Sequence, residues 1–120
     1  MSRLPQVVLF ARSAREVSAL ELEVFLEESR DRAVDLEVTG SLMLLHSGAR
    51  PTAFVQWLEG PSGAVRDLED EFSNQPFLDS SRTLVRAHPQ SRVYASWGVT
   101  RRLATDRQIV KALERFPPEQ

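Results

Sequence analysis

The sequence predicts an α+β fold in which two helices cover one face of a mixed, mostly antiparallel sheet. Short runs rich in β-branched and aromatic residues alternate with two longer segments of helical periodicity. Their order is strand, helix, strand, strand, helix, strand, strand, which is the βαββαββ order of the ferredoxin-like arrangement. A chain of 120 residues without internal repeats fits one domain with one core.

Five segments have strand character, at residues 6–11, 36–46, 51–59, 82–87 and 96–100. Alternation places Phe54, Gln56 and Leu58 of the third strand on one face of the sheet. Val55 and Trp57 point to the other face, together with Glu59. Because large apolar groups lie on both faces, we expect the face away from the two helices to be covered as well.

The helices are indicated by their caps and apolar stripes. A capping box at Ser18 and Glu21 predicts a first helix that ends near Arg32. The apolar stripe expected for it consists of Leu20, Val24, Phe25 and, more weakly, Ala33. A second helix is expected to begin after Gly60, with Pro61 in its first turn. Its partial stripe consists of Val65, Leu68, Glu69 and Phe72.

A third helix is predicted near the C-terminus. A second capping box at Thr105 and Gln108 precedes Ile109, Leu113 and Phe116. We expect a domain over 1–103, a helix over 104–116 that packs on or near the sheet's other face, and a tail over 117–120.

Composition narrows the possible partners. With 15 basic and 17 acidic residues, the net charge of −2 argues against bulk binding to nucleic acid or to an anionic membrane. The absence of cysteine excludes disulfides, thiol catalysis and thiolate metal sites. The longest apolar run, 42–45, is too short to cross a bilayer, and the N-terminus lacks a signal-peptide pattern. These features predict a cytoplasmic protein.

No enzyme motif stands out, so we predict no catalytic residue and no metal site. The candidate bases His46 and His88 lie at strand ends outside any recognisable motif. The acidic run from Asp67 to Glu71 has the spacing of a solvated helix face. Gly60 and Gly63 are wrongly spaced for a phosphate-binding loop.

Three segments resemble one known family. Phe54 to Gly60 reads FVQWLEG and is followed by a helix, Val38-Thr-Gly40 precedes an apolar strand, and Trp97 lies in the last expected strand. Together they resemble the BLUF domains, which are sensors of blue light using FAD. The resemblance runs from about Val7 to Val99 and implies the same βαββαββ fold.

The resemblance also shows departures at the positions that serve the flavin. The family's first-strand tyrosine, two positions before a serine, corresponds to Ala11, and its flavin-binding asparagine corresponds to Ala33. The polar pair after the second helix corresponds to Phe77 and Leu78, while the family's glutamine is kept as Gln56. The remaining slot position is Trp97. We therefore expect no cofactor, with these positions as remnants of a flavin slot, since each lost polar contact would cost about 1–3 kcal/mol.

Three hypotheses follow. The first is a non-enzymatic signalling module that binds a protein partner or a second copy, with partner contacts expected at Phe10, Trp57, Arg82 and Arg86. The arginines alternate along the fourth strand, either as a basic patch or as charges that protect an edge strand. The second is a blue-light sensor that binds FAD or FMN through unconventional contacts from Gln56 and Arg32. The third, an acylphosphatase-like enzyme using Arg12, rests on fold analogy alone.

Overall fold

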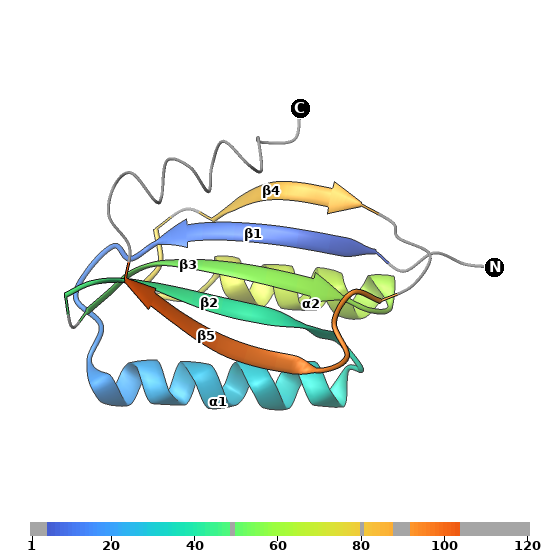
Figure 1. The fold of residues 1–120 in the computed structure, drawn as a ribbon, viewed down its shortest axis with the longest axis horizontal. Coiled ribbons are helices and arrows are strands. Elements are labelled where there is room, and N and C mark those ends of the chain that lie inside the picture. The colour runs from blue at the N-terminus through green and yellow to red at the C-terminus, as the bar shows by residue number, and fades with distance from the viewer. Residues whose placement is uncertain (1–4, 49, 80, 88–91, 104–120) are drawn as a thin grey trace.

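The computed structural model describes residues 5–48, 50–79, 81–87 and 92–103, which form a five-stranded sheet and two helices (Figure 1). In chain order the elements are β1 (Gln6–Arg12), α1 (Ala19–Asp35), β2 (Thr39–Ser47), β3 (Arg50–Glu59), α2 (Ser62–Ser73), β4 (Arg82–Ala87) and β5 (Trp97–Leu103). The predicted α+β fold class is confirmed. The helix expected at 104–116 and the tail lie outside the described residues.

β3 lies at the centre of the sheet, whose strand order is β4-β1-β3-β2-β5. β1 and β2 pair with β3 in antiparallel fashion, whereas β5 joins β2 in parallel at the opposite edge from β4. In Figure 1 α2 lies behind β3 and α1 runs along the lower side of the sheet, and residues of both helices share one core cluster with the sheet. The fourth strand is therefore an edge strand, as one of the two interpretations of its arginines requires.

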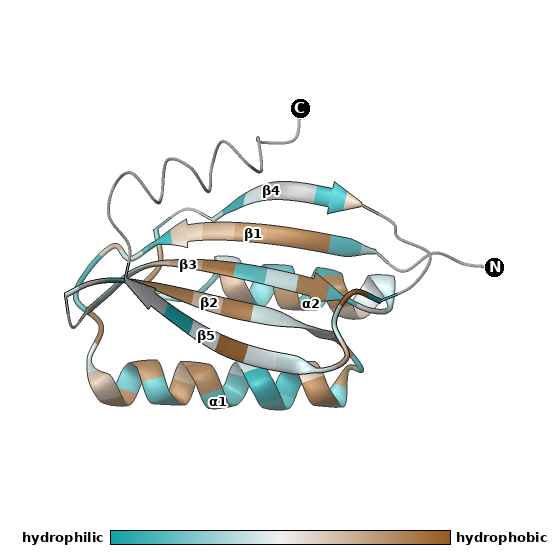
Figure 2. Cartoon of the chain, viewed as in Figure 1, coloured by the Kyte–Doolittle hydropathy of each residue, from teal (hydrophilic) through white to brown (hydrophobic). Residues whose placement is uncertain are grey.

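The sheet has apolar side chains on both faces, in agreement with the predicted alternation. The larger cluster lies on the helix side and includes Val7 and Leu9 of β1 and Phe54 and Leu58 of β3. The cluster on the opposite face consists of Val8, Phe10, Leu45, Ala53 and Val55, with Met43 and Trp57 packed against it. Figure 2 shows the apolar residues along β1 and β2, and both strands contribute to both clusters.

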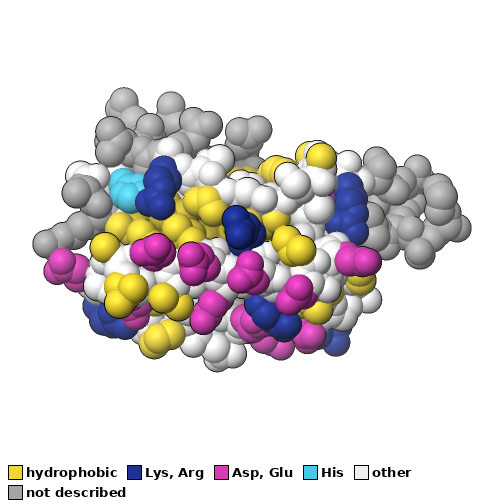
Figure 3. Space-filling view, turned by 90° about the horizontal axis from the view of Figure 1, so that it is seen from below, with side chains coloured by type: hydrophobic (Ala, Val, Ile, Leu, Met, Phe, Trp, Pro, Cys, Tyr) yellow, Lys and Arg dark blue, Asp and Glu magenta, His cyan; other side chains and the backbone are white. Residues whose placement is uncertain are grey.

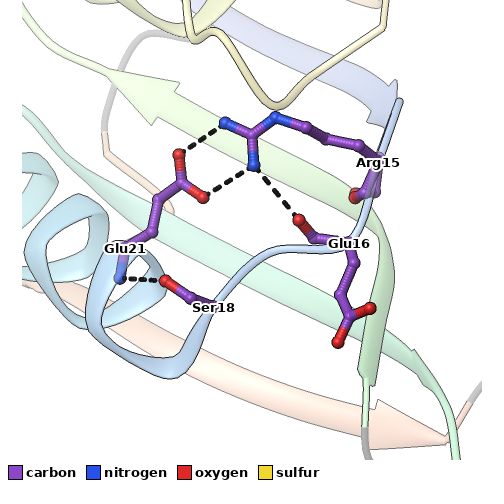
Figure 4. Close-up of polar contacts among 5 residues, drawn as sticks. Arg15, Glu16, Ser18 and Glu21 are labelled. Atoms are coloured by element: carbon purple, nitrogen blue, oxygen red, sulfur yellow. Dashed lines mark hydrogen bonds and ion pairs between the residues drawn. The ribbon is translucent and has the colours of Figure 1, made fainter.

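α1 begins where its cap predicts but packs through a different stripe. The Ser18 hydroxyl accepts a hydrogen bond from the Glu21 backbone N–H at 3.1 Å (Figure 4). The expected stripe is partly wrong, because Leu20 is 71% exposed and Val24 is also exposed. Phe25 and Ala33 are buried as predicted, and Leu22 and Leu26 pack beside them instead. The buried face of α1 is therefore rotated away from Leu20 and Val24 toward Leu22 and Leu26.

The Thr-Gly pair at the start of β2 has a steric explanation. Gly40 has φ +154°, and a Cβ at this position would lie 1.9 Å from the Trp57 carbonyl oxygen of β3. No side chain fits there without moving the backbone. The predicted start of this strand at residue 36 is wrong, because Leu36 caps α1 and Glu37 takes a left-handed φ of 59° before β2 begins.

Candidate functional site

A hollow of about 340 Å³ lies between α1 and α2, with β3 beneath it. Phe25 from α1 and Leu68 and Phe72 from α2 supply apolar walls. Its remaining lining residues are Glu28, Ser29, Asp31, Arg32, Gln56, Glu71 and Gln75. This size lies within the range of roughly 300–1,000 Å³ that small-molecule sites occupy, and apolar walls with a few polar groups are their usual composition.

Gln56 provides the polar group at the base of this hollow. It faces the helices from the middle of β3 and is paired in register with Leu9 on one side and Leu42 on the other. The residue is 5% exposed, and its Oε1 atom finds no hydrogen-bond partner within the described residues. A buried carbonyl left unpaired costs about 1–3 kcal/mol. Such a group is well suited to accept a hydrogen bond from a ligand.

An ion pair joins the two helices at the rim of the hollow. The Arg32 guanidinium of α1 donates to both carboxylate oxygens of Glu71 of α2, with the shortest contact at 2.7 Å. Hydrogen bonding to Glu71, with further attraction from Asp67 and Asp35, raises the pKa of Arg32. Both side chains are partly exposed, so this pair adds little to stability. Its main effect is to occupy the only basic group in the described lining.

A second, shallower hollow adjoins the first toward the N-terminal half of α1. The two share Phe25, Glu28 and Gln75 in their linings. The second is otherwise lined by Ser18, Leu20, Glu21, Val24, Pro76 and Phe77. The exposed Leu20 and Val24 thus form part of its wall.

Glu21 forms an ion pair with Arg15, which lies in the segment that precedes α1. The Arg15 guanidinium donates to both carboxylate oxygens of Glu21, at 2.9 and 2.7 Å, and to the backbone oxygen of Glu16 (Figure 4). Hydrogen bonding to Arg15 lowers the pKa of Glu21. The carboxylate of the predicted capping box therefore pairs with an arginine in this structure.

The four positions that the resemblance assigned to lost flavin contacts are all buried. Ala11 and Ala33 are completely enclosed in the helix-side core and do not belong to the described lining of either hollow. Phe77 packs edge-on against Phe25 and Phe54, with ring centroids 5.1 and 5.8 Å away. Leu78 is buried in the same core and forms an isolated bridge with Ser13. Phe77 narrows the second hollow while the first stays open.

At the far end of β3, Glu59 is a buried carboxylate that sequence reasoning placed on the outward face. It is completely buried and accepts hydrogen bonds from the backbone N–H groups of Val93 and Tyr94, the shortest at 2.7 Å. The Gln6 amide also donates to it, at 3.0 Å. A charged residue at the end of an apolar strand was the available signal, but its donors lie 34 and 35 residues away in the chain.

The remaining predicted site residues are dispersed. Trp97 starts β5 and packs against the helix-side core, with its Nε1 atom buried and unpartnered among the described residues. Phe10 is 6% exposed on the opposite face, where Trp57 is half-buried, so little of Phe10 is open to a partner. Arg86 pairs with Glu69 of α2 at 2.9 Å, and Arg82 is exposed on the same edge strand. His46 is the second-last residue of β2, and His88 lies outside the described residues.

Within the described part of the chain, no helix is long and apolar enough to span a membrane. The same residues contain no group of three or more histidine, aspartate or glutamate side chains arranged to hold a metal ion.

The arrangement of β3, the two helices and Gln56 can be compared with known families. The family model described as sensors of blue light using FAD matches residues 4–100. The chain belongs to the BLUF family. BLUF domains are sensory modules, and the recognition made from FVQWLEG, Val38-Thr-Gly40 and Trp97 is thereby confirmed.

Known relatives include much longer proteins. The photoactivated adenylate cyclase subunit beta of Euglena longa is 30% identical over 99% of this chain, which spans 13% of that protein. The subunit of the same name in Euglena gracilis is 30% identical over 98% of the chain and 12% of its own length. Among solved structures, the BLUF protein BlrB in its dark state superposes with a TM-score of 0.74 at 21% identity, covering 98% of this chain and 86% of that one.

Family membership corrects one prediction. The expectation that the chain has no cofactor is contradicted, because the matching family is defined by its use of FAD. That expectation gave too much weight to Ala11, Ala33, Phe77 and Leu78, none of which closes the hollow between α1 and α2. Apolar walls and an unpaired side-chain amide carbonyl in the lining fit an aromatic ring with a polar edge.

Proposed function

We propose that this BLUF domain is a non-enzymatic signalling module that binds the ring of a flavin between α1 and α2. The observation that carries the proposal is the buried Gln56 carbonyl, which has no partner among the described residues and lies at the base of an apolar-walled hollow. A glutamine amide can accept from a ring N–H or donate to a ring nitrogen or oxygen. When bound, a flavin supplies blue-light absorption and one-electron or two-electron redox chemistry.

Different residues of the hollow would contact different parts of such a ring. Phe25, Leu68 and Phe72 would supply apolar contacts to the ring and exclude water. Gln56 would orient the ring by hydrogen bonding, while Arg32 is held at the rim in its pair with Glu71. The second hypothesis names Gln56 and Arg32 as the unconventional contacts, and of these two Gln56 is the one kept here as a contact to the ring.

The light response of this domain does not use a phenol on β1. Ala11 stands at the position of the tyrosine in related domains, and it is fully buried with no hydrogen-bonding side chain. The chain has a single tyrosine, Tyr94, which lies beside Glu59 at the end of β3, away from both hollows. The signal therefore arises from flavin binding, flavin redox state or electron transfer from another donor.

The output is passed to a protein partner or to a second copy of the chain. The photoactivated cyclases named above carry a segment similar to this chain within proteins about eight times as long. By analogy, an effector that acts with this domain accounts for the sensory role without any catalytic group in the domain itself.

An absorption spectrum tests the proposal directly. Protein purified under native conditions, or refolded with excess FAD, FMN or riboflavin, is expected to be yellow and to hold one flavin per chain by mass spectrometry. Illumination with blue light then shows whether the bound flavin responds. Protein that stays colourless with all three flavins contradicts the proposed function.

A further inference from the structure

The helical layer of this domain is strongly acidic compared with the rest of the chain. α1 and α2 together carry ten Asp and Glu residues and three Arg residues. Because the whole chain has a net charge of −2, the negative charge is concentrated in these two helices. Figure 3, which views the molecule from the α1 side, shows acidic side chains spread across this surface with fewer basic ones among them.

The same imbalance holds at the hollow itself. Its described lining contains the carboxylates of Glu28, Asp31 and Glu71 and one guanidinium, that of Arg32. Arg32 is already engaged by Glu71 through both of its carboxylate oxygens. The adjoining hollow adds Glu21 and no basic residue to the described lining. Any part of a ligand that extends from Gln56 toward solvent, through either hollow, therefore passes close to carboxylates.

Natural flavins share one ring system and differ in the charge of the tail. Riboflavin ends in an uncharged ribityl chain, FMN adds a phosphate of charge about −1.5 to −2 near neutral pH, and FAD has a pyrophosphate. With the ring against Gln56, the tail extends through the acidic rim toward solvent. Like charges repel there, and this repulsion is screened by salt because it acts through water at the rim.

Resting on the proposed function, we infer that the hollow between α1 and α2 selects flavins with an uncharged tail, so that it binds riboflavin more tightly than FMN or FAD. Glu28 and Asp31 are the residues that determine this selectivity. The acidic rim acts as a site for selection because the buried, unpaired Gln56 carbonyl independently marks the hollow as a place for a ligand.

The test compares riboflavin with FMN, which differ by the phosphate alone. The chain is freed of bound flavin by reversible unfolding, and each flavin is titrated in while its fluorescence is followed. In 10 mM buffer we expect the Kd for FMN to exceed that for riboflavin about tenfold, with FAD close to FMN. In 0.5 M NaCl this ratio is expected to fall to about twofold, because screening removes the repulsion.

Two double variants separate the rim from the overall charge. Glu28→Gln with Asp31→Asn is expected to reduce the low-salt ratio of Kd values to below about threefold, mainly by lowering the Kd for FMN. Glu23→Gln with Glu27→Gln makes the same change in net charge on exposed positions of α1 outside the described linings. This control is expected to keep most of the low-salt ratio.

The possible results separate selectivity for riboflavin from flavin binding itself. Equal affinity for riboflavin and FMN at low salt, or tighter binding of FMN, overturns the selectivity while flavin binding stands. An equal effect of the two double variants overturns the assignment to Glu28 and Asp31. If no flavin binds at all, the proposed function fails and the selectivity fails with it.

Discussion

β3 carries two buried polar side chains three residues apart, and they differ in hydrogen bonding. Glu59 accepts hydrogen bonds from two backbone N–H groups and one side-chain amide. The Gln56 carbonyl accepts none from the described residues, although its residue is nearly as deeply buried. Burial of a polar group is tolerated when it is paired, and an unpaired one indicates a place for a ligand or a site that stores strain.

The two residues therefore have different effects. The contacts of Glu59 join the end of the central strand to the segment before β5, and thus help to place Trp97 three residues further on. Gln56 makes no such connection through its carbonyl and instead faces the hollow between the helices. Glu59 is a structural residue, and Gln56 is available for binding. Substitutions at and around Gln56 and Glu59 are expected to separate these two roles.

A side chain at Gly40, where β2 passes close to β3, is expected to have the largest effect on stability. In Gly40→Ala the new methyl group meets the Trp57 carbonyl, which lies between Gln56 and Glu59 in sequence. We expect a loss of about 3 kcal/mol or more in the free energy of unfolding, measured with urea. Gly63→Ala is the control, since nothing lies within 4 Å of its Cβ position, and it should change stability by less than about 1 kcal/mol. Similar effects of the two substitutions would contradict the steric argument.

Glu59→Gln tests the structural role of the paired carboxylate. The amide replaces a charged acceptor by a neutral one and presents an N–H group to backbone donors. We expect the free energy of unfolding to fall by about 2 kcal/mol, while flavin affinity stays within about twofold. Chemical denaturation and flavin titration on the same preparation measure both. A loss of flavin binding without a loss of stability would reverse the roles given to Glu59 and Gln56.

Gln56→Leu tests the binding role of the unpaired amide. Leucine keeps a similar volume and removes the unpaired carbonyl, so stability is expected to stay unchanged or to rise by about 1 kcal/mol. Flavin affinity is expected to fall about tenfold, the equivalent of one hydrogen bond. Thermal unfolding without ligand and titration with riboflavin measure the two effects. A marked loss of stability would show that the amide is needed for folding.

The Arg15–Glu21 pair gives a solvent-exposed baseline for this comparison. Arg15→Gln removes the hydrogen bonds that lower the pKa of Glu21, so that this pKa is expected to rise toward its ordinary value. Because the folded-state pKa is lowered, the stabilising effect of the pair is present above the unfolded pKa and is lost as pH falls through the folded pKa. An NMR titration of the Glu21 carboxyl in both proteins measures the shift. An unchanged pKa would show that the pair does not persist in solution.

The sequence predicted the order of the elements and the face of most strand residues. Alternation alone separated Phe54 and Leu58 from Val55 and Trp57, because strand geometry has a period of two, and the structure places the two pairs on opposite faces. The local signals at the start of α1 were equally informative, since Ser18 caps the next turn. The stripe of α1 was misjudged at Leu20 because helical periodicity gives a relative face and does not show which side chains the neighbouring elements cover.

The candidate site was harder to predict. Gln56 could be named from the FVQWLEG pattern, but the lack of a partner for its carbonyl depends on what Leu9 and Leu42 place beside it. The substitutions at Ala11 and Ala33 led to the wrong conclusion about a cofactor. They describe individual contacts, whereas the space that receives a ring is set by the packing of α1 against α2.

By itself, the sequence determined the elements, the family and the chemical groups available. It established that no phenol stands at residue 11 and that a glutamine stands at residue 56. The tertiary structure alone decided that Glu59 is paired, that Gln56 is not, and that Arg32 meets Glu71 across the hollow. The physical reason is distance along the chain. Arg32 and Glu71 are 39 residues apart, and the backbone donors to Glu59 are 34 and 35 residues away. Periodicity and caps report only on neighbours within a few residues.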